Sequence, residues 1–181
     1  NLPESPFIIA PNHQSFLDGL FVGAFLSNAE NKDTYFFAKA KHVRKGWTRF
    51  LAERNNIIVV DIDNDLKQAI QKLSSVLKRG KNIIIFPEGT RTRDGTIGAF
   101  KKTFAILGRE LEVPIVPVAI DGAYAALPSG SHVPRPFSEV KVSFLQPVLP
   151  EDLSYESLSD RVKEQISAAL EASDQVGNDT V

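Results

Sequence analysis

The chain has 181 residues, a formal net charge of −1 at pH 7 and no cysteine. This length predicts one domain with a substantial core, and the balanced charge gives no electrostatic case for nucleic-acid binding. The lack of cysteine excludes disulfides, thiolate metal ligands and an acyl-cysteine intermediate. The longest apolar runs, Leu20–Leu26 and Val113–Ile120, are far shorter than the roughly 20 residues that span a bilayer.

Short β-branched runs alternate with amphipathic helical patterns along the chain. This alternation predicts a single-domain layered α/β fold, with a central, mostly parallel or mixed sheet flanked by helices. The expected strands are Pro6–Ala10, Thr34–Ala38, Ile57–Asp61, Asn82–Phe86, Ile115–Ile120 and Val140–Leu145. The expected helices carry the apolar sets Phe16, Leu20 and Phe25; Leu66, Ile70, Leu73 and Leu77; Phe100, Phe104, Leu107 and Leu111; and Leu158, Val162, Ile166 and Leu170.

The domain is expected to cover residues 1–173, and the polar segment 174–181 is expected to fray as a tail. Prolines and glycines between Gly122 and Pro136 predict a long loop. The chain begins with Asn1 and contains no methionine, so we expect a fragment or a processed product.

His13 and Asp18 form the first candidate site. Five residues apart on one continuous helix, the two side chains would diverge by about 140°. A turn can bring them together, because Pro11 ends a strand and Ser15 is a good helix N-cap. The Asp18 carboxylate would then orient the imidazole and leave its other nitrogen free to take a proton. An alternative remains open, in which Ser15 and Asp18 form a capping box and Asp18 only caps.

A second candidate site follows the strand Asn82–Phe86. Pro87 ends the strand, Gly89 lets the backbone approach a ligand, and Arg91 offers a forked set of donors that matches phosphate oxygens. Ligand sites in open α/β sheets lie at the carboxyl ends of strands, where this segment falls. The alternative is that Glu88 is structural and ties down backbone N–H groups.

Two blocks, Asn12-His13-Gln14-Ser15-Phe16-Leu17-Asp18 and Phe86-Pro87-Glu88-Gly89-Thr90-Arg91, resemble those of the PlsC-type glycerolipid acyltransferases. That family carries His-x4-Asp and Phe-Pro-Glu-Gly-Thr-Arg, and the similarity runs from about Pro6 to Gln146. The resemblance implies a glycerolipid acyltransferase-like fold. It also implies that His13 and Asp18 are catalytic and that the acceptor binds to Glu88, Gly89, Thr90, Arg91 and Lys41.

The resemblance further implies an O-acyltransferase that needs no cofactor and no metal. The acyl donor would be acyl-CoA or acyl carrier protein. The acceptor would be a glycerol phosphate or a lysophospholipid, foremost 1-acyl-glycerol-3-phosphate. The chain departs from the family where Asn56 and Ile62 replace a glycine and an arginine, which removes one family phosphate contact and leaves the acceptor open.

Other functions remain as alternatives. The chain could be a catalytically inactive lipid- or phosphate-binding module, a serine hydrolase acting through Ser15, or the acyltransferase domain of a larger fusion. Intact His13 and Asp18 disfavour the first, and the lack of a Gly-x-Ser-x-Gly elbow disfavours the second.

Six basic residues and Trp47 lie between Lys39 and Arg54, with apolar residues at helical spacing. A basic amphipathic helix with a tryptophan favours contact with a membrane surface, although an ordinary solvated face is the alternative. We therefore expect a peripheral protein on the cytoplasmic face of a membrane. His42 and His132 are isolated and are assigned no chemistry.

Overall fold

The structure is a computed structural model that describes residues 2–39, 56–60, 65–128, 135 and 138–178. These residues form one six-stranded sheet in the order β3-β2-β4-β1-β5-β6, in which only β6 is antiparallel to its neighbour. The strands are β1 (Ile8–Pro11), β2 (Thr34–Lys39), β3 (Ile57–Val60), β4 (Asn82–Ile84), β5 (Ile115–Asp121) and β6 (Lys141–Phe144). All six expected strands are thus confirmed, as is the mostly parallel α/β class.

Strand β1 lies at the centre of the sheet, between β4 and β5, and is buried on both faces. Its alternate residues enter two separate cores, with Ile8 and Ala10 in one and Ile9 in the other, which also contains Phe7 just before the strand. This explains why the strand sequence is continuously apolar, as expected for a parallel strand covered by helices on both sides.

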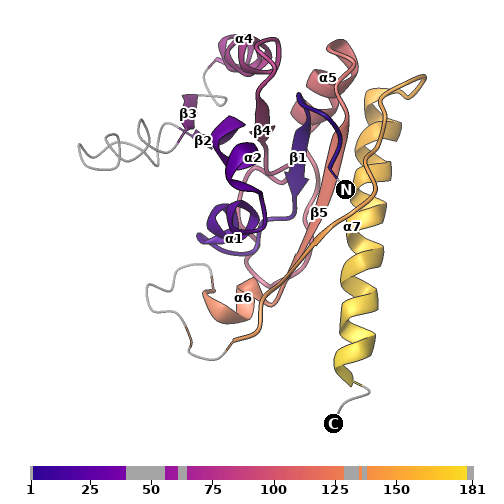
Figure 1. The fold of residues 1–181 in the computed structure, drawn as a ribbon. Helices are drawn as coiled ribbons and strands as arrows, with labels where there is room; N and C mark the ends of the chain where they lie inside the picture. Colours follow the sequence, from indigo (N-terminus) through magenta and orange to yellow (C-terminus); the bar gives the residue numbers. More distant parts are fainter. Residues whose placement is uncertain (1, 40–55, 61–64, 129–134, 136–137, 179–181) are drawn as a thin grey trace.

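Helices cover both faces of the sheet, which gives three layers (Figure 1). One core contains side chains of α4, α5 and α7, and the other contains side chains of α1 and α6. The helices are α1 (Asp18–Ala24), α2 (Asn28–Asp33), α4 (Leu66–Leu77), α5 (Thr103–Glu110), α6 (Ala123–Ala126) and α7 (Tyr155–Asn178). None of the helices in the described ranges combines the length and the apolar character needed to cross a bilayer.

The structure adds two short helices that the sequence interpretation did not include. Helix α2 begins at a capping box, in which the Ser27 hydroxyl accepts from the Glu30 N–H and the Glu30 carboxylate accepts from the Ser27 N–H. The Ser-x-x-Glu spacing is a sequence signature of a helix N-terminus and could have predicted this helix. Helix α6 occupies the beginning of the segment expected to be a loop. Helix α7 continues past Ser173 to Asn178, so the expected boundary at residue 173 is not a helix end.

Helix α1 forms where expected, but its apolar surface is not all buried. Val22 lies in the core, whereas Phe16, Leu20 and Phe25 are 73%, 69% and 63% exposed. The helix also starts later than Ser15, because Leu17 occupies the N-cap position. The Ser15 hydroxyl instead accepts from the Leu17 N–H at 3.3 Å. The assignment of Ser15 as the N-cap is therefore wrong.

Candidate active site

The candidate site lies at the carboxyl ends of the adjacent parallel strands β1 and β4. His13 follows β1 and Glu88 follows β4, so the two sequence blocks leave the sheet at the same edge. This is the edge at which open α/β sheets bind ligands. Although 75 residues separate His13 from Glu88 in the sequence, the side chain of one reaches the main chain of the other.

The Asp18 carboxylate is fully buried and its Oδ2 lies 2.8 Å from His13 Nδ1. The same oxygen accepts the backbone N–H groups of Gln14 and Ser15, at 2.7 and 2.8 Å. Asp18 therefore both orients the imidazole and fixes the turn that carries it. Only half of the expected capping box forms, because the Ser15 hydroxyl accepts from the Leu17 N–H and not from that of Asp18. Nε2 is the ring nitrogen that Asp18 leaves available for proton transfer.

The Glu88 carboxylate is buried and binds two backbone N–H groups. Its Oε1 accepts from His13 N–H at 2.7 Å and its Oε2 accepts from Gly98 N–H at 2.8 Å. Burial raises the pKa of Glu88 above its usual value, against the two backbone hydrogen bonds and the nearby His13, which act to lower it. Both carboxylate oxygens of Glu88 thus bind backbone N–H groups. This is the structural role that the sequence analysis gave as the alternative to binding the acceptor.

Two further contacts hold His13 from the second block. The Thr92 N–H donates to the His13 carbonyl oxygen at 2.8 Å. The imidazole stacks on the Phe86 ring, with centroids 4.1 Å apart and planes at 24°. The segment Phe86–Thr92 therefore contacts the N–H, the carbonyl and the ring of this histidine, and leaves its side chain 20% exposed. Neither Phe86 nor Thr92 was a predicted site residue.

The loop that carries His13 is also tied to β5 and α6. The Asn12 side chain exchanges hydrogen bonds with the main chain of Ile120, donating at 2.9 Å and accepting at 2.7 Å. The Gln14 side-chain oxygen accepts from the Tyr124 N–H at 3.1 Å. The Tyr124 hydroxyl in turn donates to the Arg93 carbonyl oxygen at 2.7 Å. Through these contacts, β5 and α6 also join the loop that carries His13 to the segment that carries Arg93.

The residues predicted to bind phosphate surround a left-handed turn. Gly89 has a φ of +66°, which favours glycine, and its N–H donates to the Phe86 carbonyl oxygen at 3.0 Å. Thr90 is exposed and Arg91 is half-buried. Within the described part of the chain, no hydrogen bond or ion pair of the Arg91 guanidinium is found. Lys101, which was not predicted, lies against Gly89.

Other predicted residues fall outside the described ranges. Lys41, Ile62 and almost all of the basic segment around Trp47 belong to this group. Asn56 is described and has a φ of +53°, a conformation that glycine and asparagine tolerate best. Asn56 therefore takes a left-handed turn before β3, whereas Ile62, which replaces the family's arginine, lies outside the described residues.

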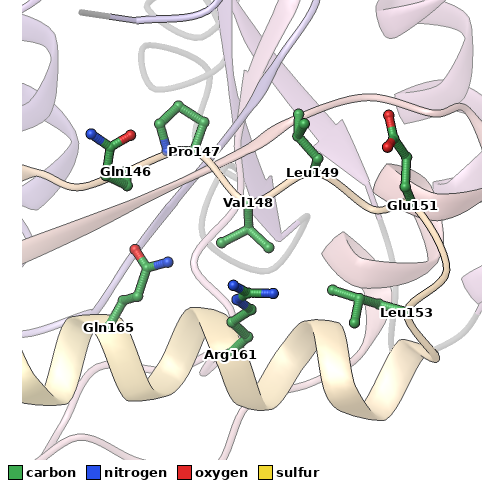
Figure 2. Close-up of a pocket in the computed structure, with 8 residues that line it drawn as sticks. All are labelled: Gln146, Pro147, Val148, Leu149, Glu151, Leu153, Arg161 and Gln165. Carbon is green, nitrogen blue, oxygen red and sulfur yellow. The ribbon is translucent and has the colours of Figure 1, made fainter.

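A hollow of about 410 Å³ lies elsewhere, between helix α7 and the segment after β6 (Figure 2). Arg161 and Gln165 point from α7 toward this segment. Val148 lines the hollow and pairs with Ile115, the first residue of β5, so the hollow lies at the opposite end of the strands from His13. In the described residues, no group of three or more metal-ligating side chains is gathered at either place.

Comparison with known proteins agrees with this geometry. The profile of the family described as Acyltransferase matches residues 1–121. A 1-acyl-sn-glycerol-3-phosphate acyltransferase of Chlamydomonas reinhardtii is 28% identical over 93% of this chain and 49% of its own. A chloroplastic enzyme of the same name from Brassica napus is 29% identical over 82% of this chain and 43% of its own. The chain thus spans about half the length of the curated relatives it matches.

A solved structure shows the same fold. The crystal structure of the 1-acyl-sn-glycerophosphate acyltransferase PlsC from Thermotoga maritima superposes with a TM-score of 0.74 and 28% sequence identity. The match covers 94% of this chain and 67% of that one.

Proposed function

The chain belongs to the acyltransferase family, and from that premise we propose that it moves a fatty acyl group from an acyl thioester to a hydroxyl of a phosphorylated acceptor. The acceptor is a lysophospholipid or a glycerol phosphate, foremost 1-acyl-glycerol-3-phosphate, the acceptor in the names of these relatives. The donor is acyl-CoA or acyl carrier protein. The observation that carries the proposal is the 2.8 Å contact between His13 Nδ1 and a buried Asp18, beside a turn suited to phosphate.

In the proposed reaction His13 moves the proton and Asp18 stabilises the charge that forms on it. His13 Nε2 takes the proton of the acceptor hydroxyl while the hydroxyl oxygen attacks the thioester carbonyl carbon. The negative charge of Asp18 stabilises the imidazolium that forms at 2.8 Å from it. The carbon–sulfur bond then breaks, and the thiolate leaves with the bonding electrons and recovers a proton from the imidazolium or from water. The products are the ester and the free thiol of the carrier.

The serine hydrolase alternative is not supported by the position of its nucleophile. Ser15 is fully buried and its hydroxyl oxygen accepts from the Leu17 N–H. A buried hydroxyl engaged with the main chain is poorly placed to attack a thioester. The inactive binding-module alternative is disfavoured because the His13–Asp18 pair is assembled and oriented.

We further propose that the domain works as a peripheral protein at the cytoplasmic face of a membrane. A lysophospholipid acceptor resides in a bilayer, so some surface near His13 must meet that bilayer or bind a lipid drawn from it. Helix α1 carries Asp18 and also presents Leu20, 69% exposed, with Phe16 just before it and Phe25 just after it. This apolar surface supports the proposal independently of the basic segment near Trp47.

An acceptor screen tests the catalytic proposal. Labelled palmitoyl-CoA and palmitoyl carrier protein are each incubated with lysophosphatidate, glycerol 3-phosphate, other lysophospholipids or no acceptor. We expect acyl transfer to a phosphorylated acceptor that His13→Ala lowers by about 10²–10⁴-fold, the usual loss for a positioned general base. Release of free fatty acid without an acceptor would favour a hydrolase. Binding of lysophosphatidate with no product from any donor would favour the binding module.

A further inference from the structure

Tyr124, on the short helix α6, contacts both loops of the candidate active site. Its N–H donates to the Gln14 side-chain oxygen at 3.1 Å, and its hydroxyl donates to the Arg93 carbonyl oxygen at 2.7 Å. Its ring also lies against Gly95, because a Cβ placed on that glycine would lie 3.3 Å from Tyr124 Cδ1. The half-buried tyrosine therefore holds one loop through its main chain and the other through its side chain.

These contacts lie on either side of the hydrogen bond that joins the two loops. In that bond the Thr92 N–H donates to the His13 carbonyl oxygen at 2.8 Å. Gln14 directly follows His13 in the sequence. Arg93 directly follows Thr92. A shift of one loop against the other would therefore have to break a contact of Tyr124 as well as this bond.

Hydrogen bonds of Asp94 hold the turn after Arg91 together. Asp94 Oδ1 accepts from the Thr92 hydroxyl at 3.0 Å, and from the N–H and the hydroxyl of Thr96 at 3.0 and 2.7 Å. Bonds of this kind between side chains and nearby main-chain groups fix the conformation of a turn. A contact at Arg93 therefore also limits the movement of Thr92 and of Arg91 before it.

The main chain that carries Tyr124 is itself firmly placed. Gly122, just before α6, has a φ of +75°, and a Cβ there would lie 2.1 Å from the Glu139 carbonyl oxygen. Ala123 and Ala126, in the same helix, are buried. The side chain of Tyr124 thus extends toward the site from main chain that is packed against the rest of the domain.

We propose that Tyr124 is a positioning residue, which fixes the separation between the imidazole of His13 and the guanidinium of Arg91. The inference rests on the proposed function, in which His13 takes the proton of the acceptor hydroxyl and Arg91 binds the acceptor phosphate. Both groups serve one acceptor molecule only when their separation matches the distance between its hydroxyl and its phosphate. Tyr124 thereby makes the site selective for the number of bonds between these two groups of the acceptor.

The test compares Tyr124→Phe with Tyr155→Phe. The first variant keeps the ring and the backbone N–H in place and removes only the hydroxyl that binds Arg93. The second is the matched control, because it removes the hydroxyl of a tyrosine at the start of α7, which donates to Glu110 outside both loops of the site. Initial rates are measured with lysophosphatidate and with its homologue built on 1,2,4-butanetriol, which has one more methylene between the hydroxyl and the phosphate.

The two acceptors should respond differently to the loss of the Tyr124 hydroxyl. We expect Tyr124→Phe to lower kcat/KM for lysophosphatidate by about 3–10-fold, the effect of one lost hydrogen bond. It should change kcat/KM for the homologue by less than about twofold, so the preference of the enzyme for lysophosphatidate narrows. Tyr155→Phe should leave both values within about twofold of wild type, as is usual for a surface substitution.

Limited trypsin digestion tests the contact without turnover. Trypsin cleaves the peptide bond after Arg93, and the carbonyl oxygen of that bond is the one that the Tyr124 hydroxyl binds. Cleavage of a folded protein follows local opening of the chain. Tyr124→Phe should therefore be cut after Arg93 about 3–10-fold faster than wild type, and Tyr155→Phe at the wild-type rate. Mass spectrometry of the fragments identifies the cleaved bond.

Two outcomes would overturn the inference while acyl transfer by the wild type stands. Unchanged cleavage after Arg93 would show that the Tyr124 hydroxyl does not hold the turn. Faster cleavage with equal losses of kcat/KM for both acceptors would make Tyr124 a structural residue that has no part in selectivity. A wild-type protein that transfers no acyl group to any acceptor would instead overturn the proposed function, and the positioning role with it.

Discussion

Glu88 Oε1 accepts a hydrogen bond from the backbone N–H of His13 at 2.7 Å, and so a residue of the Phe-Pro-Glu-Gly-Thr-Arg block holds the main chain of the candidate base. The other carboxylate oxygen holds the N–H of Gly98 at 2.8 Å. A carboxylate between two backbone segments positions both, and its loss should disturb the histidine more than the binding of phosphate.

Glu88→Gln should lower kcat by about 10–100-fold with a small change in acceptor KM. Glutamine has one acceptor oxygen, so its amide nitrogen would face either the His13 N–H or the Gly98 N–H, donor against donor. Displacement of a catalytic group by about 1 Å costs on the order of 10²-fold. Steady-state kinetics with varied acceptor measures the split. A raised acceptor KM with kcat preserved would instead make Glu88 a substrate-binding residue, as the family resemblance implies.

The stability of the protein should depend on pH through the same residue. The pKa of Glu88 in the folded chain lies above its usual value of 4.5, chiefly because burial disfavours the charged form. Between that raised pKa and 4.5 the folded state binds more protons than the unfolded state, so the unfolding free energy gains from Glu88 as pH falls. This contribution of Glu88 to the unfolding free energy is complete below pH 4.5 and is lost as the pH rises through the pKa of Glu88 in the folded chain.

Urea unfolding of wild type and Glu88→Gln at several pH values tests this sign. The stability of wild type relative to the variant should increase from neutral pH toward pH 4.5, since only the wild type can take up the proton. A relative stability that stays constant on acidification would mean that the two backbone hydrogen bonds balance burial, and one that falls would mean that they outweigh it.

Asp18→Asn should separate the two roles of this carboxylate. Oδ2 accepts from three N–H groups, whereas Oδ1 is buried with no partner among the described residues. An asparagine that places its oxygen at the Oδ2 position keeps the contacts to Gln14 and Ser15 and loses only the negative charge. We therefore expect a melting temperature near that of wild type and activity lower by about 10² or more, because the imidazolium loses its stabilising charge.

Asp18→Ala provides the comparison, because it also leaves the two backbone N–H groups of the turn without an acceptor. Each unsatisfied buried donor costs about 1–3 kcal/mol, so this variant should be clearly less stable. If Asp18→Asn keeps near-wild-type activity while Asp18→Ala unfolds, the residue is only a cap.

Arg91→Lys should raise the acceptor KM more than the donor KM. The substitution keeps the charge but replaces a planar fork with a point charge, which loses bidentate contact to phosphate. A loss of one charge-assisted hydrogen bond corresponds to about tenfold in KM. Initial rates with each substrate varied in turn measure the effect. Equal changes for both substrates would show that Arg91 supports the fold or the donor.

The sequence predicted the parts of this protein whose pattern is local. The buried strands β1, β4 and β5 are continuous apolar runs, and the approach of His13 to Asp18 needs only one turn between them. Contacts between residues far apart in the sequence could not be predicted from such local patterns. The pairing of Glu88 with the His13 main chain joins positions 75 apart, and it exists only because β1 and β4 are neighbours in the sheet.

The side of α1 that packs on the sheet could not be predicted from the sequence for another reason. Apolar residues occur all around this helix, including buried Val22 and exposed Leu20, so hydrophobic spacing alone does not identify the side that packs on the sheet. The neighbouring strands decide this, and they leave Phe16, Leu20 and Phe25 outside the core. The excess of apolar residues was the signal that some of them lie outside the core.

The last prediction concerns these exposed apolar side chains. The double variant Leu20→Ser, Phe25→Ser should bind lipid vesicles at least about tenfold more weakly than wild type, because burying a large apolar side chain contributes about 1.5–3 kcal/mol. Leu149→Ser is the matched control, since Leu149 is 54% exposed but adjoins Val148, at the opposite end of the strands from His13. Vesicle co-sedimentation at low and high salt measures both variants.

Salt distinguishes the two surfaces proposed to meet the membrane. Binding through α1 is apolar and should persist at high salt, whereas binding through the basic residues Arg44, Lys45 and Arg49 is screened by salt and weakened by charge reversal. If both surfaces contribute, the α1 double variant should retain only salt-sensitive binding. It should also keep its activity on a short-chain acceptor dispersed in detergent, because neither substituted residue belongs to the His13–Asp18 pair. Equal loss of vesicle binding in Leu149→Ser and the α1 variant would place the membrane contact outside helix α1.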